Sequence, residues 1–157
     1  MQVVAALIAH LRASSPVESV DGRIGVLTPY QLQNKLLRKH LQQHLGLEVA
    51  DRVSVSTVDG FQGQERDIII LSCVRAAGGG GSGRGSSRGG HGSVGFVADV
   101  RRMNVALTRA KTSLFVVGSL KALKVSPSWC SFIEHVTDRD AVVHNADHLL
   151  LHSHKDQ

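Results

Sequence analysis

Short apolar runs rich in β-branched residues alternate along this chain with segments of helical periodicity. Runs that are apolar on both faces suit strands buried between two layers of helices. Strands that alternate with helices predict an α/β domain with a mainly parallel sheet flanked by helices. The predicted strands are residues 24–27, 53–58, 68–73 and 114–117, and the predicted helices are residues 3–11, 31–45, 103–110 and 129–136.

The second predicted helix has the clearest boundaries. It follows Pro29, which cannot continue a central strand, and it precedes Gly46, which is placed to end a helix. Its apolar positions recur at helical spacing and predict one buried face. They are Leu32, Leu36, Leu37, Leu41 and Leu45.

The length and composition limit the class of protein. A chain of 157 residues is one domain with a proper core, and no apolar run approaches the roughly 20 residues of a membrane span. We therefore expect no membrane contact. Cys73 and Cys130 lie far apart without C-x-x-C spacing, which argues against a cysteine zinc site and favours a reducing compartment. The first 13 residues lack a basic start and are predicted as helix, not as a signal peptide.

Positive charge is concentrated in one segment. The formal net charge is +5, and residues 75–111 hold seven cations against Asp99 alone, so the rest of the chain sums to −1. Such a segment indicates a local phosphate or nucleic-acid site. The alternative is a solvated basic loop.

Two stretches do not fit a packed core. Residues 78–95 hold ten of the 16 glycines, interleaved with Ser and Arg, and are predicted as a flexible insertion in the domain. Their Arg88-Gly89-Gly90 sequence is also similar to RNA-binding RGG segments, although a plain linker is favoured. Residues 141–157 are predicted as a polar, His-rich tail. His144, His148 and His152 share a metal-compatible spacing without a completing carboxylate, so we expect no metal site.

The loop between the second and third predicted strands is rich in residues that contact ligands. In open α/β sheets, ligands bind at the carboxyl ends of strands, and we place this loop there. Its glycines, Gly60 and Gly63, allow close approach of a ligand. Thr57 and Gln62 offer hydrogen bonds, and Glu65 can accept one from a sugar hydroxyl.

A pair of arginines forms the second candidate cluster. Arg102 and Arg109 are seven residues apart and would share one face of the predicted helix, away from its apolar stripe. A planar guanidinium suits the γ-phosphate of a nucleotide. The alternative is a surface helix with solvated arginines.

The motifs of a complete nucleotide hydrolase are missing. No Gly-Lys dipeptide exists for a P-loop, and no Asp-Glu dipeptide follows an apolar strand to hold Mg²⁺. This chain by itself cannot be a complete P-loop ATPase.

Four motifs in order resemble those of superfamily 1 helicases, and the resemblance covers roughly residues 24–129. The nearest similarity is to the senataxin and up-frameshift branch, superfamily 1B. The motifs are Thr28-Pro29-Tyr30-x-x-Gln33, Val55-Ser56-Thr57-Val58-Asp59-Gly60-Phe61-Gln62-Gly63-x-Glu65-x-Asp67, Ser72-Cys73-Val74-Arg75-Ala76 and Arg102-Met103-Asn104-Val105-Ala106-Leu107-Thr108-Arg109-Ala110-Lys111.

The resemblance implies a second RecA-like domain over residues 1–140, the C-terminal half of an ATP-driven 5′-to-3′ motor on single-stranded RNA or DNA. It implies that Arg109 is the catalytic arginine finger and that Glu65 contacts the nucleotide ribose. Gln62 and Gly63 fall in the loop that couples nucleotide state to strand grip, and with Glu65 and Arg109 they form the expected nucleotide-binding set. The residues expected to line the nucleic-acid path are Thr28, Pro29, Tyr30, Thr57 and Arg75.

The resemblance also implies what lies elsewhere. ATP and Mg²⁺ are the expected cofactors, with the P-loop lysine and the Mg²⁺ ligands on a first RecA-like domain, in the same protein or in a partner. We expect this ATP-dependent helicase and nucleoside triphosphatase part to be inactive alone, and Met1 to be an internal methionine or a mispredicted start. Nuclear residence is expected, with the cytoplasm as the alternative. The alternative function is a stand-alone, non-catalytic nucleic-acid-binding module.

Overall fold

The computed structural model describes residues 1–15, 20–73, 96 and 99–144 of the chain. Within them, a four-stranded sheet has the order β2-β1-β3-β4, and every neighbouring pair is parallel. The strands are β1 (Ile24–Thr28), β2 (Ser54–Thr57), β3 (Arg66–Ser72) and β4 (Ala110–Val117). The predicted α/β fold with a parallel, helix-flanked sheet, a RecA-like arrangement, is confirmed.

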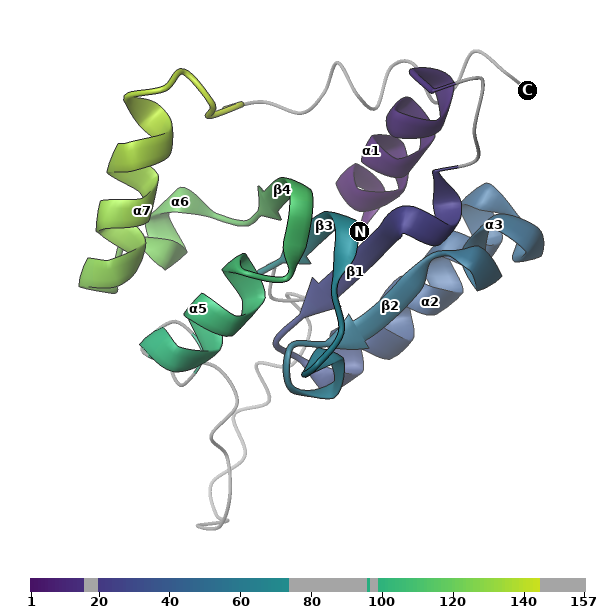
Figure 1. Cartoon of the computed structure of the whole chain (residues 1–157), viewed down its shortest axis with the longest axis horizontal. Helices are drawn as coiled ribbons and strands as arrows, with labels where there is room; N and C mark the ends of the chain where they lie inside the picture. The colour runs from purple at the N-terminus through teal and green to yellow at the C-terminus, as the bar shows by residue number, and fades with distance from the viewer. Residues whose placement is uncertain (16–19, 74–95, 97–98, 145–157) are drawn as a thin grey trace, which may run out of the picture.

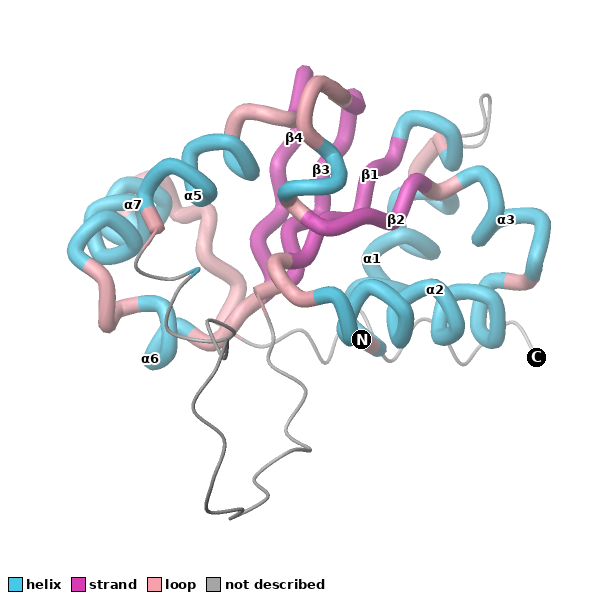
Figure 2. Tube along the Cα trace, turned by 90° about the horizontal axis from the view of Figure 1, so that it is seen from below, coloured by secondary structure: helices cyan, strands magenta, loops and turns pink. Residues whose placement is uncertain are grey.

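Helices cover both faces of the sheet (Figures 1 and 2). One layer holds α1 (Gln2–Ala13), α2 (Gln31–Leu45) and α3 (Leu47–Arg52). The other holds α5 (Val100–Leu107), α6 (Leu120–Leu123) and α7 (Pro127–Thr137). The 3₁₀ helix η1 (Asp21–Arg23) precedes β1, and the 3₁₀ helix η2 (Asp59–Phe61) follows β2.

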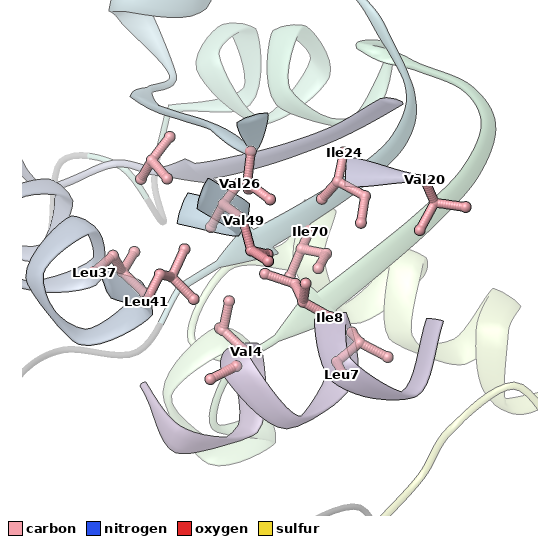
Figure 3. Close-up of a cluster of buried hydrophobic side chains, with 13 residues drawn as sticks. Val4, Leu7, Ile8, Val20, Ile24, Val26, Leu37, Leu41, Val49 and Ile70 are labelled. Atoms are coloured by element: carbon pink, nitrogen blue, oxygen red, sulfur yellow. The ribbon is translucent and has the colours of Figure 1, made fainter. Parts of the chain in front are cut away.

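Each layer of helices has its own apolar core. Figure 3 shows Ile8 of α1 beside Ile70 of the sheet. Val4 and Leu7 of the same helix belong to this cluster, and residues of α2 and α3 complete it. The opposite cluster joins the other face of the sheet to the second layer, and its buried members are Leu27, Val58, Phe61, Ile69, Leu71, Phe96, Met103, Ala106, Leu123, Trp129 and Ile133. Burial on both faces explains the near-continuous apolar runs of β1 and β3.

The boundaries of α2 agree with the prediction at both ends, since Gly46 follows the helix with a φ of 82°. Its predicted buried face is only partly right. Leu37 and Leu41 are fully buried, whereas the Leu32 side chain is 65% exposed in the first turn. The short helices α3 and α6 were not expected, because each is too brief for helical periodicity to show.

The boundary between α5 and β4 differs from the prediction. The helix ends at Leu107, and the strand begins at Ala110, four residues earlier than expected. Arg109 therefore lies beyond the helix, and the expectation that it shares a helical face with Arg102 is wrong. The physical reason is pairing with the sheet, because the backbone leaves the helix at Thr108 (φ −92°, ψ 7°), the Arg109 carbonyl accepts from the Arg66 amide (3.2 Å), and Ala110 pairs with Arg66 of β3.

Candidate functional site

The polar residues that follow β1 and β2 lie at the carboxyl edge of the sheet. Thr28 pairs with Thr57 in the parallel register, so the two strand ends lie side by side. Pro29 and Tyr30, which come directly after Thr28, are half-buried at this edge. Arg75, the remaining residue of the expected nucleic-acid set, lies outside the described residues.

The two threonines of this edge are buried, so their hydroxyls shape the backbone. The Thr28 hydroxyl donates to Gln33 Oε1 (2.7 Å) and accepts from the Tyr30 amide (3.3 Å). The Thr57 hydroxyl accepts from the Gly60 amide (3.1 Å). Both side chains support the loops that carry the exposed part of the edge, and neither presents its hydroxyl to solvent.

Gly60 packs closely against two hydroxyls. A Cβ at this position would lie 2.9 Å from the Ser56 hydroxyl and 3.0 Å from the Thr57 hydroxyl. A side chain here would require these hydroxyls to move, and the Thr57 hydroxyl already accepts from the Gly60 amide.

Residues 58–65 cross the sheet from the carboxyl edge of β2 to the amino edge of β3. Val58 and Phe61 anchor the crossing in the core, where both are buried. The ring of Phe61 lies over Gly25 of β1, where a Cβ would meet Ile69 Cδ1 at 2.8 Å. The crossing leaves Gln62, Gly63 and Glu65 exposed. Gly63 has a φ of 78°, a conformation that glycine adopts without strain.

The amino edge of the sheet brings Arg109 to the end of this crossing. Arg109 Nη1 donates to the Gln64 carbonyl (3.5 Å), and the Arg66 amide donates to the Arg109 carbonyl (3.2 Å). The expected nucleotide residues Gly63, Glu65 and Arg109 are thus neighbours. They do not lie at the carboxyl ends of strands, because Glu65 precedes β3 and Arg109 precedes β4, so that part of the expectation is wrong.

Among the described residues, the guanidinium of Arg109 is held by neutral groups. Its Nε donates to the Val105 carbonyl (3.1 Å), and its Nη2 donates to the Thr108 hydroxyl (3.3 Å). Within the described part of the chain, no carboxylate lies within ion-pair distance of it. Arg109 keeps its full positive charge available to an anion.

Arg102 has a different environment. It forms a bidentate ion pair with Asp59 of η2, with Nε–Oδ1 and Nη2–Oδ2 distances of 3.0 and 2.7 Å. The two arginines of the cluster are therefore not equivalent, since a carboxylate already neutralises Arg102. Neither this pair nor the contacts of Gln33 followed from the sequence, although all three residues fall inside the quoted motifs.

Other chemistry is not built into the described residues. No three His, Cys, Asp or Glu side chains gather there as a possible metal site. Burial raises the pKa of the Cys73 thiol to about 12, which keeps it protonated and unreactive at neutral pH. Over the same residues, no helix has the length and apolar character needed to cross a membrane. His148 and His152 lie outside the described residues.

Comparison with known proteins identifies the family of this chain. Residues 1–121 match the model of a family described as an AAA domain. The chain is 42% identical over 123 residues to Helicase SEN1 of Saccharomyces cerevisiae, which covers 78% of the chain and 5% of that protein. It is 41% identical over 128 residues to a probable helicase of Dictyostelium discoideum, covering 82% of the chain and 12% of that protein.

A mammalian relative is similar over the same region. The chain is 36% identical over 124 residues to the probable helicase senataxin of Mus musculus, which covers 79% of the chain and 4% of that protein. The chain thus spans between 4% and 12% of the length of these three relatives.

Proposed function

This chain belongs to the AAA domain family and, among superfamily 1B helicases, to the senataxin and up-frameshift branch, and from that premise we propose that it is the second RecA-like domain of an ATP-dependent helicase motor. The observation that carries the proposal is the placement of Arg109. Its guanidinium has no acidic partner among the described residues, and it lies beside a crossing whose other end reaches the carboxyl edge of the sheet.

The amino edge fits part of a nucleotide site. A guanidinium offers paired N–H donors to phosphate oxygens, and Arg109 would take the role of an arginine finger. Glu65 is exposed near Arg109 and can accept a hydrogen bond from a ribose hydroxyl. Gln62 and Gly63 are exposed in the same crossing, where the Gln62 side chain and the Gly63 backbone can contact the nucleotide. These are the residues of this chain that would contact ATP.

The P-loop and the Mg²⁺ ligands would come from outside this chain. We place them on a first RecA-like domain, in a longer polypeptide or in a partner protein, and the isolated chain is then inactive. Bound Mg²⁺ would neutralise phosphate charge there. The described residues of this chain would contribute the Arg109 cation and the Glu65 acceptor to the nucleotide site.

The carboxyl edge fits a single-stranded nucleic acid. Pro29 and Tyr30 form its partly exposed surface, and the buried hydroxyls of Thr28 and Thr57 fix the loops beneath it. Contacts to a sugar-phosphate backbone and to base faces give affinity with little sequence preference. The proposed substrate is single-stranded RNA or DNA, along which the motor would move in the 5′-to-3′ direction. Arg75 would add a further contact to the nucleic acid. The proposed location of the protein is the nucleus.

A chimera with a relative tests the proposal. The segment of Helicase SEN1 that aligns with this chain is replaced by this chain, and ATP hydrolysis is measured with and without single-stranded RNA. We expect RNA-stimulated hydrolysis. Arg109→Ala should lower kcat by about 10³-fold or more, the usual contribution of an arginine finger.

Arg101→Ala is the matched control, because Arg101 is an exposed arginine of α5 whose side chain makes no interaction with the described residues. It removes the same charge and should leave kcat unchanged. An active Arg109→Ala chimera would contradict the arginine-finger role. An inactive unmodified chimera, together with steeply salt-dependent RNA binding by this chain alone, would favour a non-catalytic binding module.

A further inference from the structure

Asp59 and Arg102 join two segments that are far apart in the sequence. Asp59 belongs to η2, in the crossing between the two edges of the sheet, and Arg102 belongs to α5, 43 residues later. Two parallel hydrogen bonds of 3.0 and 2.7 Å connect the guanidinium to the carboxylate. This fork geometry fixes orientation as well as distance.

The helix side of this pair is itself held in place. The guanidinium carbon of Arg102 lies 5.6 Å from the ring centroid of Phe96, a buried residue of the second apolar core. The Phe96 ring lies 6.1 Å from that of Trp129 in α7. Arg102 is therefore oriented by the packed body of the second helical layer.

The crossing is also anchored at its two ends. At the carboxyl edge, the Val58 amide donates to the Thr28 carbonyl (3.1 Å). At the amino edge, the Gln64 carbonyl accepts from Arg109. The pair of Asp59 with Arg102 fixes the crossing between these anchors, which are the two regions assigned to nucleic acid and to nucleotide.

Stability alone does not account for this pair. The Asp59 side chain is 66% exposed and that of Arg102 is 29% exposed. Solvent screening and the entropy of ordering two side chains limit what a partly exposed pair adds to folding, to at most about 1 kcal/mol in typical cases. The bidentate geometry also fixes the orientation of the crossing relative to α5.

We propose that the Asp59–Arg102 ion pair is a positioning contact through which nucleic-acid binding at the carboxyl edge sets the position of Arg109 at the amino edge. The proposal rests on the proposed function above. When the crossing is fixed to α5, the two move as one body. Nucleic acid that binds at the carboxyl edge then displaces the backbone that holds Arg109 at the amino edge. Without the pair, the crossing absorbs the displacement.

The chimera with Helicase SEN1 gives the functional test. Asp59→Asn and Arg102→Met should each lower the RNA stimulation of ATP hydrolysis by about 5-fold or more, the lower end of typical coupling between sites. The affinity for single-stranded RNA should not change, since neither side chain belongs to that surface. Exchanging the charges, with Asp59→Arg and Arg102→Asp together, should restore part of the stimulation.

The chain offers a control of the same kind. Glu48 and Arg52 form another exposed ion pair, at 2.8 Å within α3, outside both edges. Glu48→Gln should leave the stimulation unchanged. Full stimulation in Asp59→Asn would overturn this inference while leaving the proposed function intact, whereas an unstimulated chimera with the unmodified chain would contradict the proposed function.

A second measurement needs no activity and uses this chain alone. Within the crossing, the backbone amide of Gln62 donates to the Asp59 carbonyl (3.3 Å), and the backbone amide of Gln64 donates to the Phe61 carbonyl (3.1 Å). Asp59→Asn should accelerate hydrogen exchange at these two amides, and Glu48→Gln should not. Unchanged exchange in Asp59→Asn would show that the pair does not fix the crossing and would overturn the inference.

Discussion

Gln33 donates a 2.7 Å hydrogen bond from Nε2 to the hydroxyl of Ser72, 39 residues further along the chain. Its Oε1 accepts from the Thr28 hydroxyl at the same distance. The amide of one buried residue in α2 thus connects the carboxyl ends of β1 and β3. Through Thr28 the connection extends to the Tyr30 amide, in the loop assigned to nucleic acid.

We predict that Gln33→Met destabilises the domain by about 1–3 kcal/mol, because it leaves two buried hydroxyls without their partner. Methionine has nearly the same length, so the loss reports on hydrogen bonding and not on a cavity. Urea unfolding followed by Trp129 fluorescence measures it. Gln42→Met, an exposed position of the same helix, is the control and should change the free energy of unfolding little. Equal stability of the two variants would contradict the role of the amide.

A second prediction concerns Gly25, over which the crossing packs. Gly25→Ala should destabilise the domain by about 1–3 kcal/mol through overpacking, since its Cβ would lie 2.8 Å from Ile69 Cδ1 and 3.4 Å from the Phe61 ring. Gly22→Ala is the control, because nothing lies within 4 Å of a Cβ there. The free energy of unfolding is measured for both variants, and an unchanged value for Gly25→Ala would show that the Ile69 side chain moves aside without cost.

The sequence predicted the sheet and α2 well, for physical reasons. Strands buried on both faces must be apolar throughout, and Pro29 and Gly46 mark the limits of α2. The start of β4 was missed because Ala110, Lys111 and Thr112 lie where the strand is exposed and lacks an apolar pattern. Because the sequence placed the start of β4 too late, it also predicted that Arg109 belongs to the preceding helix.

The candidate site was only partly predictable. Motif order selected Arg109 and Glu65 as candidates, and the structure places them near each other, but spacing alone could not show that they lie at the amino edge. Burial of Thr28 and Thr57 was equally hidden, because a threonine hydroxyl can face a ligand or close a turn. Asp59 lies 43 residues from Arg102 and Ser72 lies 39 residues from Gln33, distances over which no local pattern acts.

A third prediction concerns the cysteine at the end of β3. Burial raises the pKa of Cys73 to about 12, and only the thiolate reacts with iodoacetamide. At pH 8, Cys73 should stay unmodified in the folded chain and should react once the chain is unfolded in urea. Mass spectrometry of peptides from the two samples provides the measurement. Rapid alkylation of Cys73 in the folded chain would contradict its raised pKa.

The last prediction concerns pH and His40 of α2. Burial, then the charge of His44, then that of the N-terminal amine lower the pKa of His40 below its usual value. The ring stacks on His44 with a centroid distance of 3.8 Å, and its Nε2 is buried without a hydrogen-bond partner among the described residues. The folded state therefore favours neutral His40, and the unfolded state binds its proton more readily.

A histidine whose pKa is lowered by folding contributes to stability above its unfolded pKa of about 6.5, and that contribution is lost as the pH falls below this value. The urea midpoint should thus decrease from pH 7.5 to pH 5.5, and His40→Gln should make the decrease shallower. His10→Gln, at an exposed position of α1, is the control and should leave the slope unchanged. A His40→Gln variant with the original slope would show that other groups determine the acid sensitivity of this layer.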